Sequence, residues 1–185
     1  MAAVVLAAGE GRRFGGSPDE HKLSALFRGR PVVAWSVQAA LDAGIGPVWV
    51  VCGAADLSAL LPPGVSVIVN PRWAEGQATS LQSAIDAARA AGLDSVVVGL
   101  GDQPLVTAEA WRRVAASDAP IAVATYDGKR RNPVRLSASV WEFLPTSGDL
   151  GARVVFGNRP DLVREVPCEG EPLDIDTRED LCKWS

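Results

Sequence analysis

Apolar runs that are typical of strands alternate with helical segments over residues 1–116, and this alternation restricts the chain to few fold classes. The runs are apolar nearly throughout, rather than at every second position, which is typical of parallel strands buried on both faces. The predicted strands are Ala2–Ala8, Pro47–Cys52, Val65–Val69 and Asp94–Leu100. The predicted helices are Pro31–Ala43, Ala54–Leu61, Gln77–Ala91 and Thr107–Ala116. We therefore expect an α/β fold with a Rossmann-like, doubly wound and mostly parallel sheet that has helices on both faces.

The remaining residues change this rhythm, and we expect a more irregular C-terminal third. Short strands are predicted at Pro120–Thr125 and Pro133–Leu136, around a polar turn at Asp127–Asn132. Further predicted elements are helices at Ser139–Leu144 and Leu150–Phe156, a strand at Val163–Val166 and a closing helix at Thr177–Trp184. The chain has 185 residues, no internal repeat and no low-complexity linker, so a single domain over residues 1–185 is expected.

Charge and composition exclude several classes of function. The sequence has 18 basic and 22 acidic residues, a formal net charge of −4, which disfavours broad binding to nucleic acid or to an anionic membrane. The longest apolar stretches, such as Ala2–Ala8, are far shorter than the ~20 residues of a membrane helix, and no secretory signal pattern is present. Cys52, Cys168 and Cys182 form no CxxC pair, and His21 is the only histidine, which argues against a disulfide framework, a zinc knuckle and a Ser–His–Asp triad. We expect a cytoplasmic protein.

A glycine-rich loop follows the first predicted strand. Gly9 and Gly11 allow backbone N–H groups to approach phosphate oxygens closely, and Arg13 and Lys22 add positive charge. Ligands of open α/β sheets bind at the carboxyl ends of strands, where this loop lies. The loop does not match the P-loop pattern GxxxxGK[ST]. It also fails the dinucleotide-binding pattern GxGxxG, because Phe14 stands at the third glycine and no acidic residue ends the second strand. Two interpretations are left: a phosphate-binding loop of another kind, and an unliganded surface loop.

Polar residues also follow the third and fourth predicted strands. Gly76 permits close backbone approach, and the hydroxyls of Thr79 and Ser80 either contact a nucleotide base or ribose or cap the following helix. Asp102 lies at the mouth of the fourth strand, where a carboxylate can coordinate Mg²⁺ on a nucleotide. Near the C-terminus, Asp176 suits either a second metal ligand or a helix cap, and both interpretations stay open.

Five segments, in the same order along nearly the whole chain, resemble the MobA-like nucleotidyltransferases. The family patterns are LAAG-x-S-x-R-F/M-G…K, N-P-x-W-x-x-G-x-x-x-S-L, GDQP, G-D-x-G-A-R and D-I-D-T-P-E-D-L. They are matched at Leu6–Lys22, Asn70–Leu81, Gly101–Pro104, Gly148–Arg153 and Asp174–Leu181. The likeness is strongest to the molybdenum cofactor cytidylyltransferase branch. The departures are Gly11 for serine, a longer spacer at Gly16–His21, Arg178 for proline, and Arg131 and Asn132 for the glycine and histidine of an R-G-H-P-V element.

This resemblance implies an enzyme that joins a nucleoside triphosphate, CTP in the branch it resembles, to a phosphate-bearing acceptor, molybdopterin, and releases pyrophosphate. It implies Mg²⁺ as cofactor, with Asp102 and Asp176 as metal ligands, and catalytic roles for Arg13, Lys22 and Asp102. The implied nucleotide-binding residues are Leu6, Ala7, Ala8, Gly9, Gly11, Arg13, Lys22, Gly76, Ser80 and Asp102. The implied acceptor-binding residues are Arg131, Asn132 and Arg153. Residues 1–116 are then the nucleotide-binding part and residues 117–185 the acceptor side with the closing helix, and a molybdoenzyme is the implied recipient of the product.

Two other functions stay open. One is a cytidylyltransferase for a different phosphorylated metabolite, such as a polyol phosphate, because the changes at Arg131 and Asn132 fall on the acceptor side. The other is an accessory protein that carries a pterin dinucleotide without making it. Loss of the loop cations or of Asp102 would indicate such a carrier, and this sequence retains the cations and the aspartate.

Overall fold

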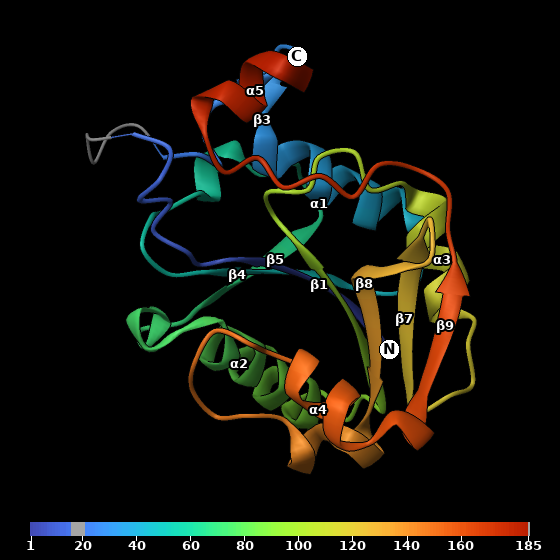
Figure 1. The fold of residues 1–185 in the computed structure, drawn as a ribbon. Helices are drawn as coiled ribbons and strands as arrows, with labels where there is room; N and C mark the ends of the chain where they lie inside the picture. The colour runs from blue at the N-terminus through green and yellow to red at the C-terminus, as the bar shows by residue number, and fades with distance from the viewer. Residues whose placement is uncertain (16–20, 185) are drawn as a thin grey trace.

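A single seven-stranded sheet is the main feature of the computed structural model, which describes residues 1–15 and 21–184 (Figure 1). The order of the strands across the sheet is β5-β4-β1-β6-β8-β7-β9. Their bounds are β1 Ala2–Ala7, β4 Val48–Cys52, β5 Val65–Val69, β6 Ser95–Leu100, β7 Ile121–Tyr126, β8 Lys129–Ser137 and β9 Val163–Pro167. Two short strands, β2 (Leu26–Phe27) and β3 (Arg30–Pro31), form a separate hairpin.

The sheet is parallel except for one strand. β1 pairs in parallel with both β4 and β6, so that Val5 lies opposite Val50 on one side and Gly99 on the other. β8 is antiparallel to both of its neighbours, and β9 is parallel to β7. The expected α/β fold with a mostly parallel, Rossmann-like sheet is confirmed.

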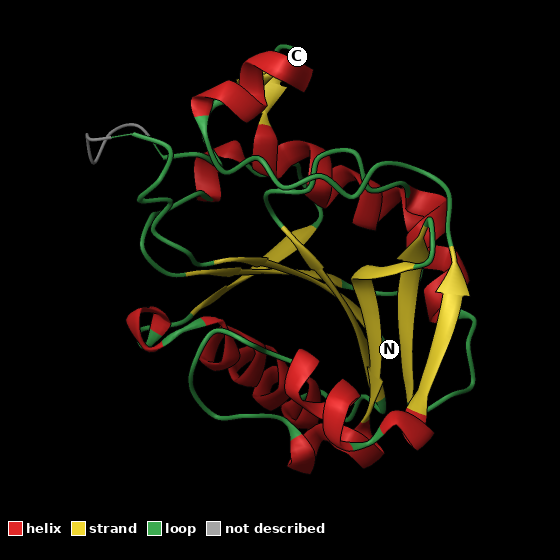
Figure 2. Ribbon diagram, viewed as in Figure 1, coloured by secondary structure: helices red, strands yellow, loops and turns green. Residues whose placement is uncertain are grey.

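Helices cover both faces of this sheet (Figure 2). The bounds of the α-helices are α1 Val32–Ala43, α2 Gln77–Ala90, α3 Ala108–Ala115, α4 Arg153–Asn158 and α5 Arg178–Trp184. Residues of α1 and α3 pack with Ala3 and Val5 of β1 in one buried cluster, and residues of α2 and α4 pack with Val4 and Leu6 in the other. Successive side chains of a strand point to opposite faces, so a strand between two helical layers is apolar at every position. None of the helices in the described part of the chain has the length and apolar character that a membrane span requires.

Two predicted helices are wrong in type. The segment Ala54–Leu61 holds only a 3₁₀ turn, η1 (Ser58–Leu60), because the Asp56 carboxylate accepts a hydrogen bond from the Ser58 N–H at 2.9 Å and so competes with a helical turn. The segment Ser139–Leu144 forms the 3₁₀ helix η3 (Ala138–Phe143). The described residues also form two further 3₁₀ turns, η2 (Trp73–Glu75) and η4 (Pro160–Leu162).

The C-terminal third also differs from the prediction in its boundaries. The turn after β7 consists of Asp127 and Gly128 alone, both with positive φ, and the residues that follow belong to the long strand β8. Pairing shifts after Val123, so Asn132 and Pro133 form a bulge without partners on β7. The predicted helix at Leu150–Phe156 starts later, as α4, and β5 is a partly exposed edge strand rather than a buried one.

We expect Gly99→Ala to lower the free energy of unfolding by about 1–3 kcal/mol, because a Cβ at this position in β6 would lie 2.4 Å from Cζ2 of the buried Trp111 ring. Gly157→Ala is the matched control, since nothing lies within 4 Å of a Cβ there and alanine favours the helix by about 0.5–1 kcal/mol. Urea unfolding of the three proteins measures the difference. Equal stabilities of the two variants would contradict the packing argument.

Candidate active site

The carboxyl ends of β1 and β6 meet at Gly101. The Gly101 N–H donates to the Leu6 carbonyl at 2.9 Å, and a Cβ on Gly101 would lie 3.2 Å from Ala7 Cβ and 3.3 Å from the Leu6 oxygen. A side chain at this position would push the two strands apart. Glycine therefore allows Asp102 to follow directly beside the loop that leaves β1.

The glycine-rich loop is closed by a histidine that the sequence analysis gave no role. The Leu23 N–H donates to Nδ1 of His21 at 3.2 Å, so Nε2 carries the ring proton and donates to the Gly9 carbonyl at 2.7 Å. Gly11 adopts a positive φ of 69°. The backbone N–H groups of residues 9–11 donate no hydrogen bond within the described residues, and so are available to an anion. The longer spacer was predicted at Gly16–His21, and its residues 16–20 lie outside the described part of the chain.

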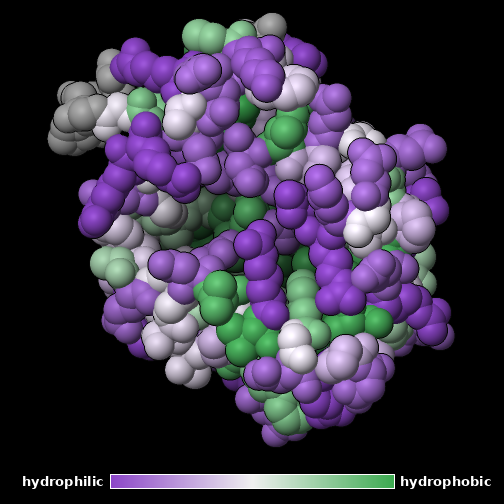
Figure 3. Space-filling view, in the orientation of Figure 1, coloured by the Kyte–Doolittle hydropathy of each residue, from purple (hydrophilic) through white to green (hydrophobic). Residues whose placement is uncertain are grey.

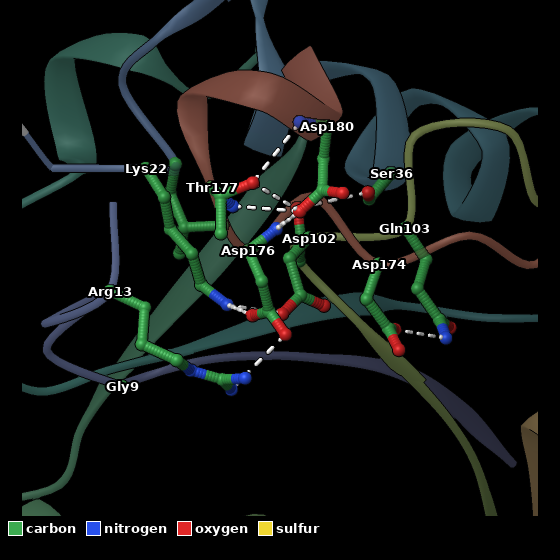
Figure 4. A network of polar contacts seen from close by, with 12 residues as sticks. Gly9, Arg13, Lys22, Ser36, Asp102, Gln103, Asp174, Asp176, Thr177 and Asp180 are labelled. Atoms are coloured by element: carbon green, nitrogen blue, oxygen red, sulfur yellow. Dashed lines mark hydrogen bonds and ion pairs between the residues drawn. The ribbon is translucent and has the colours of Figure 1, made fainter. Parts of the chain in front are cut away.

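Lys22 lies between two carboxylates (Figure 4). Its Nζ is 2.6 Å from Oδ2 of Asp102 and 2.8 Å from Oδ1 of Asp176, and its side chain is only 13% exposed. The other oxygen of Asp176 pairs with Nη2 of Arg13 at 3.1 Å. Burial alone would lower the pKa of Lys22, but attraction to Asp102 and Asp176 outweighs it and raises the pKa above its usual value. The ammonium is therefore charged at neutral pH.

A third carboxylate, Asp174, faces the same space and was missed as a site residue. Gln103, which is 2% exposed, donates from Nε2 to Oδ1 of Asp174 at 2.8 Å, and the Ile175 N–H donates to the Asp102 carbonyl at 2.9 Å. Burial, and next the charge of Asp102, raise the pKa of Asp174. Because alternate residues of an extended segment share a side, the spacing of Asp174 and Asp176 around buried Ile175 offered a signal for this residue.

The helix cap after this segment is formed without Asp176. Oγ1 of Thr177 accepts a hydrogen bond from the Asp180 N–H at 3.1 Å, and Oδ2 of Asp180 accepts one from the Thr177 N–H at 2.9 Å. This reciprocal pair is a capping box at the start of α5. Of the two interpretations of Asp176, the helix cap is wrong, and its carboxylate faces Lys22 and Arg13 instead.

The hydroxyls of Thr79 and Ser80 are engaged by a buried asparagine. Asn70 is 1% exposed, and its Nδ2 lies 2.9 Å from Oγ1 of Thr79 and 3.0 Å from Oγ of Ser80. Oδ1 of Asn70 accepts a hydrogen bond from the Arg72 N–H at 2.9 Å. The Thr79 and Ser80 hydroxyls therefore fix the loop between β5 and α2, and the N-cap of α2 is Gly76, which offers no side-chain cap.

A cavity of about 580 Å³ gathers the predicted nucleotide-binding residues. Its lining includes Leu6, Ala7, Ala8, Gly9, Gly11, Arg13, Lys22, Gly76, Ser80, Asp102 and Asp176. The lining residues that were not predicted as site residues are Glu10, Arg12, Leu23, Trp73, Ala74, Gln77, Leu100, Asp149 and Asp174. The described residues of the lining hold five carboxylates against three basic side chains, so a polyphosphate would meet net negative charge there unless cations accompany it.

The carboxylates suit a divalent cation in part. Oδ1 of Asp102 is buried and has no hydrogen-bond partner among residues 1–15 and 21–184, and oxygen ligands of this kind are those that Mg²⁺ prefers. Asp176 offers a second carboxylate across Lys22. No group of three or more His, Cys, Asp or Glu side chains within residues 1–15 and 21–184 is arranged to hold a metal on its own. The residues therefore fit a cation that also takes ligands from a bound phosphate.

A second cavity of about 470 Å³ adjoins the first and shares Leu6, Gln77 and Leu100 with it. The space-filling view shows a hollow in this face with apolar residues at depth and hydrophilic ones around it (Figure 3). The apolar lining comes mainly from Leu81, Val98, Val123, Val134, Leu136 and Phe156. The predicted acceptor residues Arg131, Asn132 and Arg153 line it together with Arg130, and no acidic residue does within the described chain.

The wall between the two cavities is built from two loops. The Gly148 N–H donates to the Glu75 carbonyl, and the Ala78 N–H donates to the Gly148 carbonyl, both at 2.9 Å. Gly76 has a φ of +107°, and a Cβ there would lie 2.5 Å from the carbonyl carbon of Gly148. The loop before α4 is thus held against the start of α2, and Gln77 borders both cavities.

A parallel sheet with a glycine-rich loop and carboxylates at its strand ends defines an α/β nucleotide-binding class. Residues 3–163 match the MobA-like NTP transferase domain, and the chain belongs to this family of nucleotidyltransferases. Nicotine blue oxidoreductase from Paenarthrobacter nicotinovorans is 29% identical over 98% of this chain and 94% of its own length. Purine catabolism protein PucB from Bacillus subtilis is 28% identical over 97% and 93%. The 2-C-methyl-D-erythritol 4-phosphate cytidylyltransferase of Synechococcus is 33% identical over 63% of this chain and 52% of its own.

Solved structures share the fold over almost the whole chain. Rv0371c from Mycobacterium tuberculosis H37Rv superposes with a TM-score of 0.82 at 28% identity, covering 98% of this chain and 95% of that one. A structure of Rv0371c in complex with manganese gives a TM-score of 0.79 at 28% identity, covering 99% and 96%.

We expect Asn70→Ala to lower the free energy of unfolding by about 1–3 kcal/mol, because it leaves buried hydroxyl groups without their partner. Ser83→Ala is the control: it removes one hydrogen bond from the same helix to the Thr79 carbonyl and should cost less than about 0.5 kcal/mol. Chemical denaturation measures both. Asn70→Ala with the stability of the parent protein would show that this network does not hold the loop.

Proposed function

We propose that this nucleotidyltransferase joins CTP to molybdopterin with Mg²⁺ and releases pyrophosphate. The observation that carries the proposal is the pair of adjoining cavities, one polar and bordered by the glycine-rich loop, the other apolar and bordered by arginines. In this assignment residues 1–116 supply the nucleotide site, and residues 117–185 supply the acceptor side and the closing helix. The reaction takes place in the cytoplasm, and a molybdoenzyme receives the product.

The nucleotide side is supported by groups that suit a triphosphate. The N–H groups of residues 9–11, which have no partner among the described residues, and the side chains of Arg13 and Lys22 would hold the β- and γ-phosphates. Asp102 and Asp176 would hold Mg²⁺, which supplies charge neutralisation at the transferring phosphorus when bound. Leu6, Ala7, Gly76 and Ser80 lie farther along the same cavity lining and would contact the nucleoside.

The reaction requires no strong base. A phosphate oxygen of the acceptor, already ionised near neutral pH, attacks the α-phosphorus of CTP, and the bond from that phosphorus to the α,β-bridging oxygen breaks. The electron pair leaves with pyrophosphate, whose growing charge Arg13 and the loop N–H groups stabilise. His21, the one histidine, is fixed between Leu23 and Gly9 and has no part in this step.

The acceptor side is supported by its lining. The apolar side of the cavity offers a planar heterocycle a dry contact surface, on which the hydroxyls of a polyol would find no hydrogen-bond partner. Arg131 and Arg153 would bind the acceptor phosphate, with Asn132 beside them. The relative named as a cytidylyltransferase supports CTP. The oxidoreductase name of another relative is not carried over, because the dinucleotide pattern fails at Phe14.

The central experiment incubates the full chain with Mg²⁺, purified molybdopterin and each of the four nucleoside triphosphates, and measures pyrophosphate. Release with CTP and molybdopterin is expected. Parallel reactions with 2-C-methyl-D-erythritol 4-phosphate test the polyol phosphate alternative. Release with the polyol phosphate alone would replace the acceptor, and tight molybdopterin binding with no release for any nucleotide would favour the carrier protein.

Asp102→Ala should abolish turnover. The loss in kcat should be at least ~10²–10³-fold, which is the usual effect of removing one preorganised group that stabilises charge. Circular dichroism should remain that of the parent protein. Asp86→Ala, which removes the same charge from the exposed side of α2, is the control and should keep full kcat. Parent-like kcat of Asp102→Ala with Mg²⁺ would exclude the assigned role.

Arg153→Ala should raise KM for the acceptor about tenfold to a hundredfold, because a charge-assisted hydrogen bond contributes about 1.5–3 kcal/mol. KM for CTP should not change. Arg164→Ala serves as the charge-matched control, because Arg164 is an exposed arginine of β9 that pairs with Asp118. An unchanged acceptor KM in steady-state kinetics would remove Arg153 from the acceptor site.

A further inference from the structure

The charges around Asp102 and Asp176 already balance before any ligand binds. The Lys22 ammonium contacts both carboxylates, and Arg13 pairs with the remaining oxygen of Asp176. Two positive side chains therefore face two negative ones. The charge of these two carboxylates is thereby offset, and two of their four oxygens are held by Lys22, so a divalent cation must compete with the ammonium for them.

We propose that Lys22 is the resident counter-ion of the Asp102–Asp176 pair and keeps a divalent cation out of it until a triphosphate draws the ammonium away. This inference rests on the proposed function for the identity of the two carboxylates as metal ligands. It adds a role for Lys22 that phosphate binding alone does not give, which is control of metal affinity in the nucleotide-free protein.

The position of the Lys22 stem makes both roles available to one side chain. Lys22 Cγ lies 3.2 Å from the position of a Cβ on Gly11, so the stem runs directly beneath the glycine-rich loop. From there the flexible side chain can place its ammonium either between the carboxylates or against an anion on the loop. Anion binding at the loop would release the carboxylates, so metal and triphosphate would bind cooperatively.

The first test measures metal affinity without nucleotide. Mn²⁺ is titrated into the full chain and the free ion is followed by its EPR signal. Lys22→Gln should bind Mn²⁺ at least tenfold more tightly than the parent protein, because a competing cation is removed from the same oxygens. Lys129→Gln, the same charge change at the exposed start of β8, should leave the affinity unchanged. Unchanged or weaker binding by Lys22→Gln would overturn the proposal.

The second test uses the parent protein and does not depend on the folding of Lys22→Gln. The sequence has three lysines, Lys22, Lys129 and Lys183, so ¹³Cε-lysine labelling gives three NMR signals. Lys129→Gln and Lys183→Gln assign the other two, which identifies the Lys22 signal by elimination. Inorganic triphosphate should shift the Lys22 signal alone, whereas Mg²⁺ added by itself at the same concentration should leave it in place. A Lys22 signal that does not move at triphosphate concentrations that saturate the thermal shift of the protein would overturn the displacement.

Both readouts are independent of catalysis. If no pyrophosphate is released from CTP and molybdopterin, the proposed function fails, and the Mn²⁺ affinities and the lysine signal still test the counter-ion role. Conversely, pyrophosphate release with parent-like Mn²⁺ affinity in Lys22→Gln would keep the proposed function and reject the counter-ion role.

Discussion

Burial of β1 on both faces is the constraint on which the rest of the structure depends. Every residue of Ala2–Ala7 is buried, and the strand pairs in parallel with β4 and β6. A strand in this position has no polar side chains of its own, so the first groups that can bind a ligand are those of the loop after it. The short side chains near its end let Gly101 approach the Leu6 carbonyl, which aligns Asp102 with that loop.

Electrostatics then decide what the polar cavity can accept. The chain is net acidic, and the cavity at the strand ends has more carboxylates than basic side chains. Affinity for a polyphosphate must therefore come from backbone N–H groups, a few cations and accompanying metal ions, rather than from a broad basic surface. The second cavity has the opposite character, apolar within and bordered by arginines. Two cavities of different chemistry thus adjoin each other at the strand ends.

Local patterns were sufficient to predict most of the fold. The apolar run of β1 and the Thr107 cap of α3, which accepts a hydrogen bond from the Ala110 N–H, depend on residues close in sequence. The same holds for the loop glycines and for Asp102 after β6. These features follow from period and position alone.

What could not be predicted depends on partners far apart in the chain. The hydrogen bond between Gln103 and Asp174 joins residues 71 positions apart, and no local pattern predicts it. The bulge at Asn132 in β8 is set by its pairing with β7, and the short hairpin of β2 and β3 has too few residues for a periodic signal. The role of His21 depends on the Gly9 carbonyl and the Leu23 N–H around it.

The attachment of Gly148 to the start of α2 has a consequence for how such a protein can diverge. Because one peptide segment borders both cavities, a change that widens one of them displaces a boundary of the other. Substitutions on the far side of the apolar cavity, along β8 and α4, can reshape that cavity alone, whereas insertions between η3 and α4 would displace both. Divergence by the first route would alter one binding space while its neighbour is inherited unchanged.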